Sequence, residues 1–86
     1  MSDSTTETMT STESALAEMW RDLLGPADFG TGDDFFAAGG TSLTAIKFLQ
    51  RVVVRFGPDA LSPETLYADP TLSSLARAID AATERG

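Results

Sequence analysis

Apolar residues recur every three or four positions between about residues 13 and 24 of the chain. The repeating residues are Leu16, Met19, Trp20, Leu23 and Leu24. This spacing marks one face of an amphipathic helix, and we expect Trp20 to lie in the core on that face. Thr10 or Thr12 is a candidate N-cap. Gly25-Pro26 should end the helix, because glycine allows a left-handed residue and proline cannot continue the helix.

The second periodic segment should begin at Thr41 or Ser42 and end at Phe56, just before Gly57-Pro58. A rotation of about 100° per residue gives this helix a predicted core face. The core face consists of Ala45, Ile46, Leu49, Val52, Val53 and Phe56. The opposite side carries three cations four residues apart, which are Lys47, Arg51 and Arg55. The flanks carry Leu43, Phe48 and Val54, at least one of which should stay partly exposed.

Two more helices are predicted in the last third of the chain. A short helix over residues 63–67 has Ser62 as its N-cap and a proline at its first position. The last helix follows Asp69-Pro70, with Thr71 as its N-cap. No alternating β pattern stands outside these segments. We therefore predict an all-α fold, a four-helix bundle with a short third helix.

A connection of about fifteen residues, 27–41, separates the first two predicted helices. Loops of this length are uncommon in compact domains unless they are functional or anchored by their own side chains. Phe29, Phe35 and Phe36 are the candidate anchors that close the core beneath the loop.

The chain length of 86 residues allows one domain. We expect a disordered polar tail over residues 1–11, a folded domain over 12–83 and a short tail over 84–86. The N-terminal segment lacks the basic and apolar regions of a secretory signal, and no apolar run is long enough to span a membrane. A cytoplasmic protein is the expectation that follows.

Two residue types are absent from the chain, namely cysteine and histidine. Their absence excludes disulfides, cysteine-ligated zinc and thiol nucleophiles, and it removes the commonest general base. We therefore expect neither catalytic nor metal-binding residues. The 13 acidic against 6 basic residues give a net charge of −7, which disfavours nucleic acid or an anionic membrane surface as a partner.

Gly39-Gly40-Thr41-Ser42-Leu43 is the stretch with the most distinctive chemistry, at the junction of the long loop and the second helix. Two glycines allow a partner to approach the backbone closely, and Ser42 lies where a helix N-terminus favours anions. The plain alternative is that Ser42 or Thr41 only caps the helix. A phosphate-binding P-loop is ruled out because no Gly-Lys-Ser/Thr follows, and a hydrolase nucleophile elbow has almost no support.

Residues 34–43, Asp-Phe-Phe-Ala-Ala-Gly-Gly-Thr-Ser-Leu, resemble the signature of carrier proteins of nonribosomal peptide and polyketide synthesis. Three further stretches are similar to the family: Leu23-Leu24, Arg55-Phe56-Gly57 and residues 66–72, Leu-Tyr-Ala-Asp-Pro-Thr-Leu. The resemblance covers about residues 13–82. Two residues depart from the family pattern. Thr41 stands where a histidine or aspartate is usual before the serine. Ala38 stands where a leucine is usual, and this smaller side chain would pack the loop less tightly.

The resemblance implies that Ser42 bears a 4'-phosphopantetheine arm from coenzyme A, within a motif of Gly39, Gly40, Thr41 and Leu43. A phosphopantetheinyl transferase would attach the arm. An adenylation enzyme would load the terminal thiol, and downstream condensation, tailoring or ketosynthase enzymes would act on the thioester. The chain itself would be a non-catalytic carrier and a monomer. The absence of cysteine fits this scheme, because the reactive sulfur arrives with the arm.

Partner docking is expected along the second helix. The candidate docking residues are Leu43, Ile46, Lys47, Phe48, Arg51 and Arg55. The basic character of this helix favours a peptidyl carrier over an acyl carrier of polyketide or fatty-acyl synthesis, which stays open as the alternative. A helical interaction module that never carries an arm is the third hypothesis. Because the chain starts at Met1 and stops soon after the last predicted helix, we expect a discrete carrier, with an excised domain as the alternative.

Overall fold

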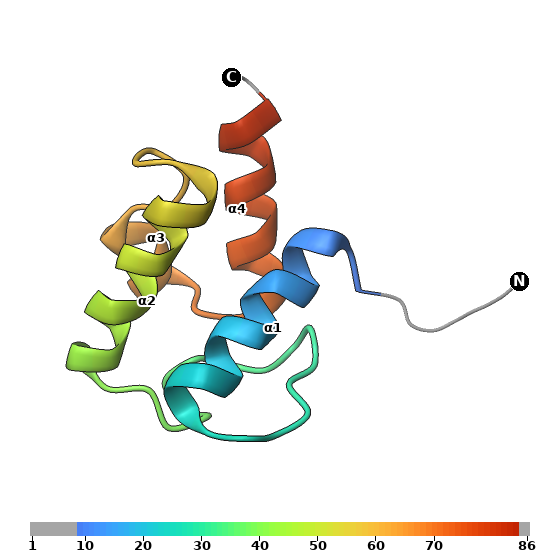
Figure 1. Ribbon diagram of the computed structural model, residues 1–86, viewed down its shortest axis with the longest axis vertical. Helices are drawn as coiled ribbons and strands as arrows, with labels where there is room; N and C mark the ends of the chain where they lie inside the picture. The colour runs from blue at the N-terminus through green and yellow to red at the C-terminus, as the bar shows by residue number, and fades with distance from the viewer. Residues whose placement is uncertain (1–8, 85–86) are drawn as a thin grey trace, which may run out of the picture.

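The computed structural model describes residues 9–84 and contains four helices in that range, as predicted (Figure 1). They are α1 (Ser11–Leu24), α2 (Ser42–Phe56), α3 (Pro63–Ala68) and α4 (Leu72–Glu84). Helix α1 packs against both α2 and α4, and α3 packs against α4. Within the described residues no helix is long and apolar enough to cross a membrane.

The start of α1 lies inside the segment expected to be a disordered tail. The Thr10 side chain accepts a hydrogen bond from the Glu13 amide at 3.1 Å, and the Glu13 carboxylate accepts one from the Thr10 amide at 2.8 Å. This reciprocal capping box makes Ser11 the first helical residue. The predicted boundary at residue 12 is therefore late, and residues 1–8 of the predicted tail lie outside the described part of the chain, as do residues 85–86.

Aromatic side chains form the centre of the core. Trp20 is fully buried and meets the rings of Phe29 and Phe35 edge-on, each with a centroid distance of 5.5 Å. Phe35 also stacks on Phe48 at 5.4 Å. Edge-on and offset rings of this kind stabilise a core beyond the area they bury. The prediction that Trp20 and the loop phenylalanines close the core is confirmed.

The buried face of α2 differs from the predicted one. Its fully buried residues are Ala45, Phe48 and Val52, whereas Ile46 is 53% exposed and Val53 is 42% exposed. The helix is rotated because Phe48 fills the space beside Trp20 and Phe35, which moves Ile46 and Val53 out of the core. The interpretation of Phe48 as a docking residue is wrong, because a fully buried ring cannot touch a partner.

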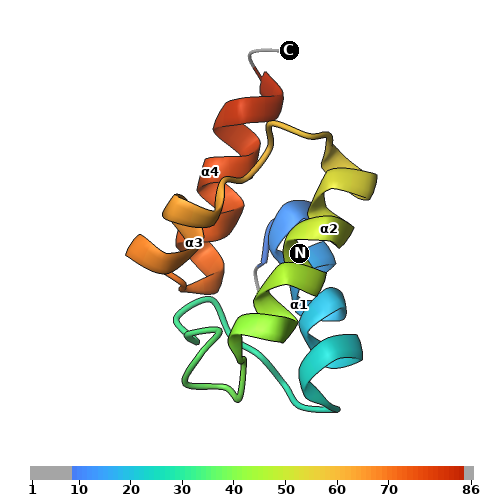
Figure 2. The same ribbon diagram turned by 90° about the vertical axis from the view of Figure 1, so that its left-hand side faces the viewer.

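The long loop is tied to the start of α4 by backbone hydrogen bonds (Figure 2). The Leu72 amide donates to the Asp33 carbonyl at 3.0 Å, and the Ser73 amide donates to the Thr31 carbonyl at 2.9 Å. Loop carbonyls thus satisfy the first amides of α4, while the Thr71 hydroxyl donates instead to the Asp69 carboxylate. A loop held in this way at its middle can present its far end in a fixed position.

Candidate functional site

The segment before α2 is shaped by the Asp34 carboxylate. It accepts hydrogen bonds from the amides of Phe36 at 2.8 Å and Ala37 at 3.0 Å, which is the pattern of an aspartate turn. The turn sends the Phe35 ring into the core and leaves Phe36 to stack on Tyr67 of α3, with ring centroids 5.4 Å apart. The aspartate and the two phenylalanines therefore anchor the loop between the core and α3.

Each glycine of the pair before the helix has a separate structural requirement. Gly39 has φ +115°, a conformation that side chains rarely adopt. A Cβ on Gly40 would lie 2.4 Å from the Phe35 ring and 2.7 Å from the Phe35 carbonyl oxygen. We expected the glycines to leave room for a partner, but the space beside Gly40 is filled by Phe35. The Gly40 amide also donates to the Phe35 carbonyl at 2.9 Å, which fixes the chain just before the helix.

Thr41 is the N-cap of α2, and Thr44 completes its capping box. The Thr41 hydroxyl accepts from the Thr44 amide at 3.2 Å, and the Thr44 hydroxyl accepts from the Thr41 amide at 2.6 Å. These two bonds satisfy the amides of Thr41 and Thr44 without the Ser42 side chain. Of the two candidate caps, Thr41 is therefore the N-cap of α2, and Ser42 is the first helical residue.

Ser42 is the first residue of α2, and its side chain is exposed. Among residues 9–84, no partner takes a hydrogen bond from its hydroxyl. The first turn of α2 carries no acidic residue, so the positive end of the helix dipole is left unopposed beside Ser42. This is an environment that suits a negatively charged phosphodiester on the serine oxygen, and the residues present fit such a group.

Leu43 and Ile46 extend the exposed surface next to Ser42. Leu43 is 62% exposed and Ile46 53% exposed, and Val53 continues the same side of α2 toward its C-terminal end. Three apolar residues along one open helix face are a typical protein contact surface. Leu43 and Ile46 were predicted as docking residues, although Ile46 also fitted the period of the predicted core, whereas Val53 was expected only in the core.

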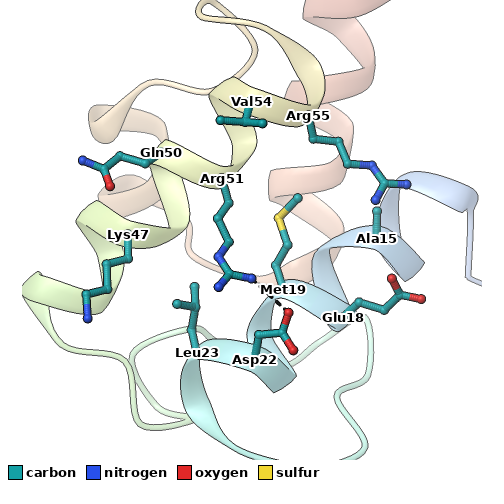
Figure 3. Close-up of a pocket in the computed structure, with 10 residues that line it drawn as sticks. All are labelled: Ala15, Glu18, Met19, Asp22, Leu23, Lys47, Gln50, Arg51, Val54 and Arg55. Carbon is teal, nitrogen blue, oxygen red and sulfur yellow. Dashed lines mark hydrogen bonds and ion pairs between the residues drawn. The ribbon is translucent and has the colours of Figure 1, made fainter.

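The three cations of α2 do not lie beside Ser42. Arg51 and Arg55 turn toward α1 (Figure 3), where the Arg51 guanidinium pairs with the Asp22 carboxylate at 2.9 Å, whereas Lys47, one turn earlier, is not directed at α1. The predicted docking residues thus divide into an apolar set at Ser42, a cationic set with two members turned toward α1, and the buried Phe48.

The comparisons with known proteins agree with this geometry. Residues 14–79 match the family described as "Phosphopantetheine attachment site". The chain is 41% identical over 69 residues to phosphinothricin tripeptide synthetase PhsC of Streptomyces viridochromogenes, and 40% identical over 73 residues to chondramide synthase cmdD of Chondromyces crocatus. These matches cover 80% and 85% of this chain but only 6% and 2% of the synthetases.

Solved structures of peptidyl carrier proteins share the fold. The carrier protein in a complex with the phosphopantetheine transferase Sfp and coenzyme A superimposes with a TM-score of 0.80 and 32% identity, over 86% of this chain and 95% of that one. An active-site mutant of a peptidyl carrier protein gives a TM-score of 0.81 and 32% identity, over 88% of this chain and 83% of that one. The chain belongs to the phosphopantetheine attachment site family, whose members are carrier domains that bear 4'-phosphopantetheine.

Proposed function

We propose that this chain is a peptidyl carrier and that Ser42 is the residue that bears its 4'-phosphopantetheine arm. The observation that carries the proposal is the position of Ser42, exposed at the first turn of α2 and relieved of the capping role by Thr41 and Thr44. The Ser42 side chain is exposed, is not the N-cap and lies next to an apolar surface. It is therefore accessible to a modifying enzyme. The folded carrier domain in this proposal comprises residues 12–83 together with the helical end residues Ser11 and Glu84.

The residues of the chain would position the arm and leave the chemistry to partner enzymes. Ser42 would hold the arm through a phosphate ester, and the start of α2 would favour its negative charge. When bound, the arm supplies a terminal thiol that carries the aminoacyl or acyl group as a thioester. The chain has no cysteine or histidine of its own to catalyse a reaction, so we propose a non-catalytic role.

The partners in this proposal follow from the relatives. The relatives named above are peptide synthetases, and one structural neighbour is a peptidyl carrier protein in a complex with a phosphopantetheine transferase. We propose a phosphopantetheinyl transferase, an adenylation enzyme and downstream condensation or tailoring enzymes as partners of a cytoplasmic monomer. The acyl carrier of polyketide or fatty-acyl synthesis is the second candidate, because the site geometry alone would serve either cargo.

Intact mass tests the proposal directly. The purified chain is incubated with coenzyme A, magnesium and a promiscuous phosphopantetheinyl transferase, after a check that it is unmodified at the start. We expect the mass to rise by one phosphopantetheinyl unit. Unchanged mass in an unmodified sample would contradict the carrier assignment. Subsequent loading with an amino acid by an adenylation enzyme would support the peptidyl subclass, and loading only with an acyl group would support the alternative.

Charge introduced next to Ser42 should impair docking of the transferase. Leu43→Asp or Ile46→Asp should lower kcat/KM for arm transfer by about tenfold or more, because a carboxylate would replace an apolar contact at the centre of the interface. The native fold should persist, since both side chains are already exposed.

Val54→Asp is the matched control for these two variants, because Val54 is an exposed aliphatic residue of the same helix about three turns further from Ser42. Its transfer kinetics should equal those of the parent. Equal losses in all three variants would show that added negative charge, and not the surface beside Ser42, determines the rate.

A further inference from the structure

A groove with a volume of about 540 Å³ lies between α1 and α2 (Figure 3). Its floor is formed by Ala15, Met19 and Leu23 of α1. The small Ala15 side chain leaves space between the two helices, and Met19 and Leu23 supply an apolar base. The groove is open and lined by residues of two neighbouring helices, an arrangement that can accept another helix.

The two walls of the groove carry opposite charges. Glu18 and Asp22 line the α1 side, and Lys47, Arg51 and Arg55 line the α2 side. Three of the six basic residues of this acidic chain therefore gather in one groove. A concentration of cations on a protein of net charge −7 is not explained by overall solubility, for which the acidic residues suffice.

Much of this charge lacks a partner within the chain. Arg51 pairs with Asp22, but both side chains remain about half exposed or more, at 46% and 66%. Among residues 9–84, no ion pair is formed by Lys47, and Arg55 lies over the ring of Phe56 at 5.8 Å. The spacing of four residues places the cations in a row about 6 Å apart along the axis of α2. An acidic helix lying alongside α2 with the same spacing would match them one to one.

Val54 supplies an apolar contact on the same wall. Its side chain is 88% exposed, the most exposed of the large apolar residues in the described range, and it lines the groove beside Arg51 and Arg55. A β-branched apolar side chain left in water next to cations has no role in the fold. It would be buried by a helix that pairs its own acidic edge with the cations.

We propose that the groove between α1 and α2 binds an acidic amphipathic helix of a partner protein. The apolar stripe of that helix rests on Met19, Leu23 and Val54, and its row of carboxylates meets Lys47, Arg51 and Arg55. Leu43 and Ile46 do not line the groove, but Leu43 lies one turn before Lys47, so the bound helix borders the surface beside Ser42. The proposal does not depend on whether Ser42 is modified.

A designed peptide tests the groove. The probe is an amphipathic helix of about 18 residues with leucines along one face and glutamates at i, i+4 and i+8 along one edge. Its binding to the full chain is measured by fluorescence anisotropy, and the contact residues are mapped by amide chemical shifts. We expect the largest shift changes at Met19, Leu23, Arg51 and Val54, and smaller ones at Leu43 and Ile46, which do not line the groove.

Variants of the full chain show where the peptide binds and separate the electrostatic contribution to its affinity from the apolar one. The double variant Lys47→Glu, Arg55→Glu should weaken binding by about tenfold or more, and Val54→Asp by about tenfold. Arg77→Glu, on an exposed position of α4, is the charge control and should bind as the parent does. Uptake of the arm by the parent chain is measured separately by intact mass, so that a failure of the carrier assignment is distinguished from a failure of peptide binding here.

Three results would overturn the proposal. The first is an equal affinity for the same peptide with lysines in place of its glutamates. The second is an equal loss of affinity in Arg77→Glu and in the groove variants. The third is a concentration-dependent shift of the groove amides without peptide, which would make the groove an interface between two copies of this chain.

Discussion

Ser42→Ala is expected to abolish transfer of the phosphopantetheine arm while leaving the free energy of unfolding within about 0.5 kcal/mol of the parent value. The transfer is lost because the hydroxyl that would form the phosphate ester is gone. Stability is kept because the Ser42 side chain is exposed and the helix end is capped by Thr41 and Thr44. Intact mass reports the transfer, and urea unfolding followed by Trp20 fluorescence reports the stability.

Thr41→Ala is the matched control, one residue earlier in the same exposed turn. It removes the hydroxyl that accepts the Thr44 amide and should cost about 1 kcal/mol of stability. The arm should still be attached, since Ser42 remains. A mass gain in Ser42→Ala would place the attachment elsewhere. A stability loss in Ser42→Ala as large as that in Thr41→Ala would show that Ser42 shares the capping role.

Local sequence signals predicted the elements of the fold well. The glycine-proline stops, the Ser62 cap and the three- to four-residue apolar period depend on neighbouring residues only, and the four helices follow them closely. The same holds for the loop anchors, since a phenylalanine in a polar loop has little alternative to burial. Ser42 is a candidate for the same reason, because a glycine pair, a serine and a leucine at a helix start form a local motif.

Features that depend on tertiary packing were not predictable in the same way. The apolar residues of α2 cover more than half of its circumference, so the period alone could not decide which of them face the core. The burial of Phe48 depends on its contacts with Trp20 and Phe35, which belong to other segments of the chain. A physical cue was still available, because the largest apolar side chain of the helix gains most from burial.

The rotation of α2 gives this helix three separate surfaces. Phe48 and Val52 face the core, Leu43 and Ile46 are exposed next to Ser42, and Arg51 faces α1. A helix with its core face toward Ile46 would have no apolar surface beside the serine. The burial of Phe48 is therefore what makes Leu43 and Ile46 available to a partner, so core packing and the candidate docking surface are consequences of one rotation.

Gly40→Ala is expected to lower the free energy of unfolding by about 3 kcal/mol, a large part of the stability of a domain this size. The added Cβ would lie 2.4 Å from the Phe35 ring and 2.7 Å from the Phe35 carbonyl oxygen. Neither neighbour can move easily, since the ring is fully buried against Trp20 and Phe48 and the carbonyl belongs to the backbone. Urea unfolding measures the loss.

Gly32→Ala is the matched control, because Gly32 lies in the same loop with nothing within 4 Å of an added Cβ and no positive φ. Its stability should equal that of the parent or exceed it slightly, since alanine restricts the unfolded chain. Arm transfer should also slow in Gly40→Ala under native conditions, because the displaced Phe35 would shift the turn that leads to Ser42. If Gly40→Ala were as stable as Gly32→Ala, the loop could relax around Phe35, and the fixed presentation of Ser42 would not depend on this contact.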